Sequence, residues 1–91
     1  MTVEQIIQTL MRIHKKYSGD RSVTPDSQMC AIWPIDDPPD VLENTPQLDE
    51  IEDALDFGFT EEQAVEFYDM EIDEAAQYMF DVIEEWVKKN L

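Results

Sequence analysis

The chain has 91 residues, with 22 acidic and six basic side chains and a formal net charge of −16 at pH 7. This length allows one small domain with a single modest core, and a hydrophobic content of 43% excludes a disordered acidic tail. The single cysteine, Cys30, excludes an internal disulfide, and the lack of long apolar runs predicts a cytoplasmic protein without membrane spans or a secretory leader.

The first predicted element is a helix close to the N-terminus. Thr2 and Gln5 have the spacing of a capping box, in which each side chain bonds the backbone of the other residue. Apolar residues then recur every three or four positions, and Gly19 suits the position just past a helix end. We expect the helix to run from about Val3 to Tyr17, with basic residues near its C-terminus, where the helix dipole favours cations.

The next apolar segment, Gln28 to Ile35, is the only credible strand. Pro34 has no backbone N–H, so the strand would lie at a sheet edge. It needs a partner, which is either a short strand at Arg21 to Thr24 or a second copy of the chain, and the sequence is compatible with a homodimer. The two faces of this strand are Met29, Ala31, Trp33 and Ile35 on one side, and Cys30 and Ile32 on the other.

An acidic loop is predicted from Asp36 to Asn44, stiffened by two adjacent prolines. Thr45 is then expected to cap a helix that has Pro46 at its first position, which is a favourable start. We expect that helix to end at Gly58.

The last part of the chain is predicted to be helical from Thr60, which forms a second capping box with Gln63. No Gly or Pro occurs in residues 59–91, so one long helix to about Lys89 is an option. A break near residues 70–73 is the other option, with Asp73 as the new N-cap. The apolar stripe has steps of three and four and consists of Val65, Tyr68, Ile72, Ala76, Met79, Ile83 and Trp86.

These elements predict a mainly α fold with one short extended segment or small β element. We expect a single acidic domain over residues 1–91. Its parts are an N-terminal helix (1–19), an extended segment with the acidic Pro-rich loop (20–45), and a C-terminal set of two or three helices (46–91).

Several kinds of chemistry are excluded or disfavoured by the residue types. Two glycines cannot make a nucleotide-binding loop, and one Cys with one His cannot make a zinc site. The loop acids have neither the spacing nor the glycine of a calcium-binding EF-hand. We expect His14 to be a boundary or surface residue, Cys30 to be a small core residue, and the protein to be neither an enzyme nor a cofactor carrier.

Residues 54–80, "ALDFGFTEEQAVEFYDMEIDEAAQYMF", resemble part of a ubiquitin-associated (UBA) domain. Phe57, Gly58 and Phe59 match the Met-Gly-Phe-type loop after the first UBA helix, and the Ala-Ala-x-Tyr-Met pattern at 75–79 matches the third helix. The segment between the second and third helices is shorter than in the family and lacks the usual Asn or Gly. The resemblance implies a ubiquitin-binding module whose contact loop is residues 57–59.

The acidic residues are not spread evenly. The first 23 residues contain four bases and two acids, a balance of +2, whereas the remainder contains 20 acids and two lysines, a balance of −18. No base occurs between Thr60 and Val87, although a merely soluble helix gains stability from interspersed Lys and Glu. In a continuous helix one edge would carry Glu62, Glu66, Asp69, Asp73, Asp81 and Glu84.

Regular carboxylates on such an edge would lie roughly 5–6 Å apart, and a DNA strand carries one charge per roughly 3.4 Å. The sequence therefore predicts a surface that binds a basic protein groove in place of DNA or RNA, and that does not bind nucleic acid itself. The predicted partner-binding residues are Asp36, Asp37, Asp40, Glu43, Asp49, Glu50, Glu62, Glu66, Asp69 and Asp73.

In general character the chain is similar to small acidic phage- and plasmid-borne anti-defence inhibitors, which include anti-CRISPR and anti-restriction DNA mimics. This similarity implies inhibition of a CRISPR effector or nuclease in the host cytoplasm. An immunity protein against a basic nuclease toxin would have the same chemistry. Trp33 either anchors the partner or belongs to the core, and Trp86 is expected in the core.

Overall fold

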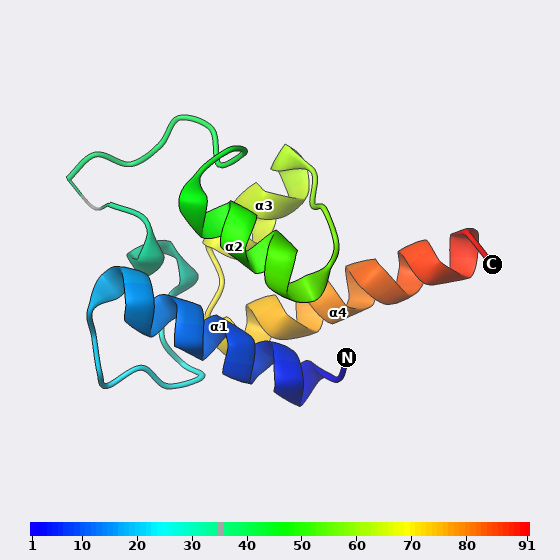
Figure 1. Ribbon diagram of the computed structural model, residues 1–91, viewed down its shortest axis with the longest axis horizontal. Helices are drawn as coiled ribbons and strands as arrows, with labels where there is room; N and C mark the ends of the chain where they lie inside the picture. Colours follow the sequence, from blue (N-terminus) through cyan, green and yellow to red (C-terminus); the bar gives the residue numbers. More distant parts are fainter. Residues whose placement is uncertain (35) are drawn as a thin grey trace.

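The computed structural model describes residues 1–34 and 36–91. It confirms the mainly α fold, with four α-helices, one short 3₁₀ helix and no strand among the described residues. The elements are α1 (Val3–Ser18), η1 (Met29–Ile32), α2 (Pro46–Leu55), α3 (Glu61–Tyr68) and α4 (Ile72–Lys89), arranged as Figure 1 shows.

Helix α1 lies at the centre of the packing and contacts α2, α4 and η1. The predicted capping box of Thr2 and Gln5 is present, and Gly19 ends the helix in the left-handed conformation with φ 71°. The contact face buries Ile6 and Leu10, each only 1% exposed. Both predicted ends of this helix are therefore confirmed to within one residue.

His14 is a buried residue of α1, only 2% exposed, and the prediction of a boundary or surface position was wrong. Its Nδ1 lies 2.9 Å from Ser18 Oγ, and its Nε2 lies 3.1 Å from the carbonyl oxygen of Gln28. The Gln28 carbonyl comes from a segment that folds back against α1. The helical pattern of residues 3–17 contains no signal for this contact. The imidazole is buried because both ring nitrogens have polar partners.

The predicted strand at Gln28 to Ile35 is also wrong, for the residues that the structure describes. Gln28 forms only an isolated antiparallel bridge with Glu71, and η1 follows it. The backbone N–H of Met29 donates to Met70 O at 2.9 Å. Within the described residues the pairing partner is thus the junction of α3 and α4, and not residues 21–24. Ile35 lies outside the described residues.

Side-chain burial explains why this segment forms a helical turn. Met29, Ile32 and Trp33 are buried, and their spacing of three and four fits a helix better than an alternating strand. Trp33 is 2% exposed, so of its two predicted roles the core role is the one observed. Cys30 is only half-buried and does not belong to the core.

Helix α2 begins as predicted, with Pro46 at its first turn and Thr45 Oγ1 accepting the N–H of Leu48. It ends at Leu55, three residues before Gly58, because Asp56 adopts the left-handed conformation (φ 52°) and serves as the C-cap. Asp is one of the few non-glycine residues that enters this region readily.

The C-terminal part divides into two helices. The capping box of Thr60 and Gln63 is present, and α3 ends at Tyr68. Of the two options for residues 61–89, the break is therefore the one observed. The N-cap of α4 is Glu71, so the prediction of Asp73 as the N-cap is wrong. The two neighbouring backbone N–H groups, those of Ile72 and Asp73, bond to carbonyls of residues 27 and 25.

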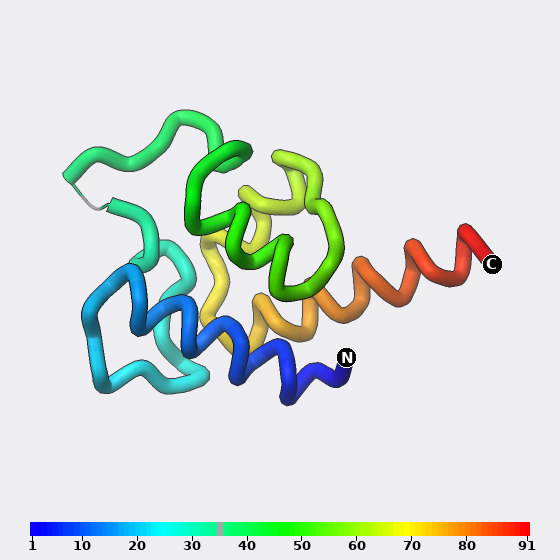
Figure 2. The backbone as a smooth tube through the Cα atoms, in the orientation of Figure 1, coloured from blue at the N-terminus to red at the C-terminus, as the bar shows by residue number. Residues whose placement is uncertain are grey.

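Helix α4 projects beyond the rest of the molecule, and the tube in Figure 2 shows its last turns extending away from the other helices. Trp86 lies on these turns and is 54% exposed, so its predicted core position was wrong. The break between α3 and α4 shifts the contact face, and Ala64 and Phe67 are buried while Val65 is 49% exposed. The apolar periodicity beyond Met79 therefore continues on turns that are only partly covered, with Val82 and Ile83 half-buried.

Candidate functional site: an acidic loop between two hollows

The acidic loop, defined here as residues 36–41, arches outward from the helices between η1 and α2 (Figure 2). Asp36, Asp37 and Asp40 are all exposed on it. The loop contains no basic residue. Its adjacent prolines limit the backbone conformations that it can adopt.

The C-terminal end of the loop is fixed by a carboxylate from α3. The backbone N–H of Leu42 donates to Glu61 Oε1 at 2.7 Å and to Oε2 at 3.1 Å, and the N–H of Glu43 donates to Oε2 at 2.9 Å. Leu42 itself is buried, 5% exposed. Hydrogen bonds to an ionised acceptor are shorter and stronger than neutral ones, so Glu61 anchors the loop firmly.

Sequence reasoning did not select Glu61 as a functional residue. It occupies the first position of α3, where an acid is common because it interacts favourably with the helix dipole. Its partners are backbone groups 18 and 19 residues earlier, and the sequence contains no signal for that contact.

The segment before the loop is tied to the same place. Trp33 Nε1 donates to Thr45 Oγ1 at 3.1 Å, and the Thr45 hydroxyl donates to Leu42 O at 2.8 Å. The buried Gln47 side chain donates from Nε2 to Ile32 O at 3.2 Å. These bonds hold Trp33, Leu42 and the start of α2 together. The loop is therefore pre-organised, which lowers the entropic cost of binding a partner.

Two surface hollows flank the loop and share Pro39 and Asp40 in their walls. The loop–α3 hollow has a volume of about 290 Å³ and includes Glu61, Val65 and Asp69. The loop–α2 hollow has a volume of about 430 Å³. Each hollow combines apolar walls with carboxylates, an arrangement that suits the aliphatic stem and charged end of a basic side chain.

An aromatic contact lies beneath the two hollows. Trp33 is in the wall of the loop–α2 hollow, and Tyr68 is in the wall of the loop–α3 hollow. Their ring centroids are 5.3 Å apart with an interplanar angle of 52°. An aromatic contact thus joins the walls of the two hollows.

The structure brings some of the predicted partner-binding residues together and separates others. Asp37, Asp40 and Asp69 line the two hollows, and Glu62 and Glu66 are exposed on the adjoining helix α3. Asp36 and Glu43 are exposed on or beside the loop, and Asp49 is exposed on α2. Glu50 instead lies between α1 and α2, and Asp73 lies at the junction of α3 and α4.

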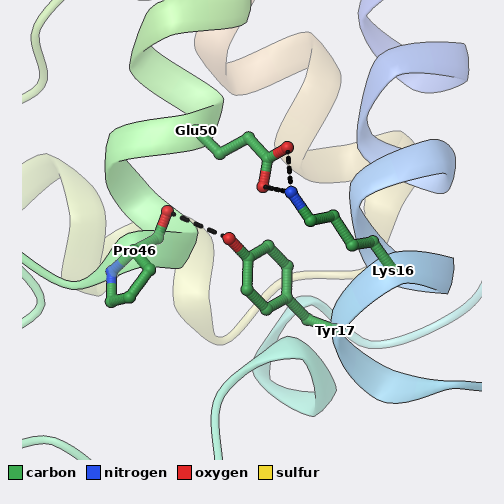
Figure 3. A network of polar contacts seen from close by, with 4 residues as sticks. All are labelled: Lys16, Tyr17, Pro46 and Glu50. Atoms are coloured by element: carbon green, nitrogen blue, oxygen red, sulfur yellow. Dashed lines mark hydrogen bonds and ion pairs between the residues drawn. The ribbon is translucent and has the colours of Figure 1, made fainter.

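Glu50 belongs to a polar network between α1 and α2 (Figure 3). Lys16 Nζ donates to its two carboxylate oxygens at 2.9 and 3.1 Å, and the Tyr17 hydroxyl donates to Pro46 O at 3.5 Å. The hydrogen bond from Lys16 holds the pKa of Glu50 below its ordinary value. Glu50 therefore joins two helices and is less available to a partner than the loop acids are.

Asp73 lies at the junction of α3 and α4, in a cluster with Asp26 and Glu71. One carboxylate oxygen of each residue lies within 4.8 Å of the others. Desolvation, followed by repulsion from Asp26, Asp73 and Glu74, raises the pKa of Glu71. The break at this junction also divides the predicted line of helix acids, because Glu62 and Glu66 are on α3 whereas Asp73, Asp81 and Glu84 are on α4. The continuous acidic edge predicted for one long helix does not exist.

The acidic residues have few basic partners. Within residues 1–34 and 36–91, the two ion pairs are Lys16–Glu50 at 2.9 Å and Lys89–Glu85 at 3.4 Å. Neither involves the acidic loop or α3. The carboxylates around the two hollows are consequently uncompensated by positive charge from the chain itself.

The segment that was compared with a UBA domain spans parts of three helices. Residues 57–59 connect α2 to α3, and residues 75–79 lie in α4. Phe59 is 6% exposed and contacts Phe67, whereas Phe57 is half-buried and packs edge-on against Trp86 with centroids 5.9 Å apart. Gly58 is exposed.

Comparison with family models, with curated proteins and with solved structures found no match to this chain. None of the helices in the described part of the chain has the length and apolar character needed to cross a membrane.

Proposed function

We propose that this protein is an inhibitor that occupies the basic nucleic-acid-binding groove of a partner such as a CRISPR effector or nuclease. The observation that carries the proposal is the anchored acidic loop, whose exposed carboxylates have no positive partner among the described residues. Such a concentration of like charge opposes the compact state, and a basic partner surface offsets that cost.

The mechanism is electrostatic attraction followed by exclusion of the nucleic acid. Carboxylates around the two hollows are attracted to the Lys and Arg side chains that otherwise contact phosphates. Because Glu61 and Thr45 already hold Leu42 at the C-terminal end of the loop, less backbone freedom is lost on binding. The inhibitor acts by occupancy, without a catalytic step or cofactor, in the cytoplasm of the host cell.

The test begins with recovery of the partner from a host lysate by pull-down and mass spectrometry, followed by purification of that protein. We expect the wild-type chain to compete with DNA or RNA for it. Reversal of the loop acids (Asp36→Lys, Asp37→Lys, Asp40→Lys) should reduce the association rate more than tenfold at low salt, and the effect should fade as salt rises.

The matched control reverses three exposed acids of α4, Glu74, Asp81 and Glu84, and changes the net charge by the same amount. Circular dichroism verifies that both variants are folded. Equal losses in the two variants would reduce the proposal to a nonspecific charge effect. A partner that binds alongside its nucleic acid would contradict it. An immunity protein would be identified within the same test, because its partner would be a nuclease toxin.

Ubiquitin binding is a second candidate, favoured by the helix order and by the exposed Gly58 beside half-buried Phe57. Titration of labelled ubiquitin into the wild-type chain tests it directly. Under this function Phe57→Ala should abolish ubiquitin binding by a protein that remains folded, and the loop reversals should leave ubiquitin binding unchanged.

A further inference from the structure

The outer end of α4 has an apolar face that the rest of the described chain covers only in part. Ile83 and Val87 lie on this face, and Phe80 and Leu91 continue it at steps of three and four residues. Ile83 is half-buried and Val87 is 38% exposed. Among the described residues, Ile83, Val87 and Leu91 belong neither to the core nor to the side chains packed against it. These turns extend beyond the other helices (Figure 1).

A row of charged side chains runs along one flank of this apolar face. Asp81, Glu84 and Lys88 follow one another at steps of three and four residues, and all three are exposed. The ion pairs that form within residues 1–34 and 36–91 involve other residues, so Lys88 has no ion-pair partner there. The row has its two acids nearer the body of the molecule and its base nearer the outer end. Such an order of charges is complementary to itself when it is reversed.

We infer that a second copy of this chain packs antiparallel against this face of α4. A two-fold axis between Ile83 and Val87 places Ile83 of each copy against Val87 of the other, and it brings the same flank of both helices together. Lys88 of each copy then lies level with residues 81–84 of the other copy, beside Asp81 and Glu84. A parallel pair would instead place like charges side by side, which is unfavourable.

The net charge of −16 on each chain opposes any contact between two copies. The position of the face limits this cost. The acidic loop and the outer end of α4 lie at opposite ends of the long axis of the molecule, which extends 42 Å (Figure 1). The two loops of the dimer therefore point away from each other, and their separation exceeds the Debye length of about 8 Å at physiological ionic strength. Each loop stays free, so the dimer does not depend on the proposed function.

The small size of the face determines the kind of dimer. Interfaces that bury less than about 1,200 Å² are typical of transient complexes, so we expect reversible association with a Kd on the order of 100 μM. Sedimentation equilibrium of the full chain from about 10 μM to about 1 mM should show the average mass rising towards twice that of one chain. The Kd should fall severalfold between about 0.05 M and about 0.5 M NaCl, because salt screens the repulsion between copies.

Two variants that add the same negative charge locate the contact. Val87→Glu should weaken association at least tenfold, because it places a carboxylate against Ile83 of the other copy. Ser22→Glu adds its charge at an exposed position on the loop after α1 and should change the Kd less than twofold. Circular dichroism verifies the fold of both variants. Amide NMR shifts of residues 83 and 87 should depend on the concentration of the wild-type chain, and those of residue 37 should not.

Glu84→Lys distinguishes the antiparallel pairing from general charge repulsion. The substitution makes the net charge of each chain less negative by two, so repulsion alone predicts tighter association. The antiparallel pairing predicts the opposite, because the new lysine faces Lys88 of the other copy. We expect the Kd to rise about fivefold. Adding Lys88→Glu to Glu84→Lys reverses both partners of the pair and should restore the wild-type Kd.

A chain that stays monomeric up to about 1 mM at both salt concentrations would overturn the inference. Tighter association of Glu84→Lys, or unchanged association of Val87→Glu, would do the same. If the chain stays monomeric and a purified nucleic-acid-binding partner shifts the resonances of residues 83 and 87, the apolar face binds that partner and the dimer is wrong. Failure of the loop reversals to affect partner binding would overturn the proposed function and leave the dimer.

Discussion

Glu61 binds the backbone of Leu42, with a carboxylate oxygen 2.7 Å from the Leu42 nitrogen. This contact joins the first residue of α3 to the end of the acidic loop, across 19 residues of sequence. It uses one acidic side chain to position others, because Asp40 and Pro39 lie in the same hollow as Glu61.

The first prediction concerns this contact. Glu61→Ala should leave the backbone N–H groups of Leu42 and Glu43 without their acceptor and loosen the loop. Bonds to a charged acceptor are worth about 1.5–3 kcal/mol when buried, and half-exposed Glu61 should contribute at the lower end of that range. Hydrogen exchange at residues 42 and 43 should accelerate relative to the wild type. Glu62→Ala, one residue away and exposed, should leave exchange at residues 42 and 43 unchanged.

The second prediction concerns the ion pair between α1 and α2. The folded-state pKa of Glu50 is lowered, so the pair contributes stability above the unfolded-state pKa and loses it as pH falls through the lower folded value. Glu50→Gln should therefore lower the free energy of unfolding at pH 7, by a small amount because the pair is partly exposed. Denaturant melts at pH 7 and at pH 3 measure this, and the difference from wild type should shrink at the lower pH. Asp49→Asn is the matched control.

The third prediction has the opposite sign. The pKa of Glu71 is raised by desolvation and by neighbouring acids, so its ionisation disfavours the folded state. The protein is therefore more stable when Glu71 is protonated. This extra stability is fully present below the unfolded-state pKa and is lost as pH rises through the higher folded-state pKa. Glu71→Gln should stabilise the protein at pH 7 and have little effect in acid. A destabilised Glu71→Gln variant at pH 7 would show that the carboxylate has a favourable role at the α3–α4 junction.

Local signals in the sequence predict the helix starts well, since Thr2, Thr45 and Thr60 each form the expected cap within a few residues of chain. Predictions fail where a distant segment decides the outcome. His14 is buried because Gln28 supplies a carbonyl. Residues 28–32 are not a strand because only Met29 bonds the α3–α4 junction, while the Ala31 N–H bonds a carbonyl three residues earlier. Composition is enough to identify the acids of the loop. The roles of Glu61 and Gln47 depend on contacts that exist only in the folded chain.

The two tryptophans provide the fourth prediction, because both belong to apolar patterns in the sequence and their environments in the structure differ. Trp33 is 2% exposed, contacts Tyr68 and donates to Thr45, whereas Trp86 is 54% exposed on the projecting part of α4. Trp33→Ala should cost about 3–5 kcal/mol of stability, enough to unfold a small domain. Trp86→Ala should cost less than half of that, since the side chain is already more than half exposed and its ring contacts Phe57 edge-on. Thermal melts followed by circular dichroism compare the two.

The last prediction concerns salt, which acts on all the charges at once. Repulsion among the acids opposes folding, so salt should stabilise the protein by screening it. The two described ion pairs favour folding, so screening them should destabilise the protein. The acids greatly outnumber the pairs, with 22 acidic residues in the chain. Their repulsion also acts over a long range at low ionic strength, where the Debye length is about 30 Å at 0.01 M.

Repulsion among the acids should dominate, and the melting temperature should rise between 0.01 M and about 0.5 M NaCl. Repeating the melts with Glu50→Gln separates the two effects, because the rise should become steeper once the Lys16 pair is removed. A falling melting temperature in both proteins would mean that favourable charge contacts outweigh the repulsion on which the proposed function depends.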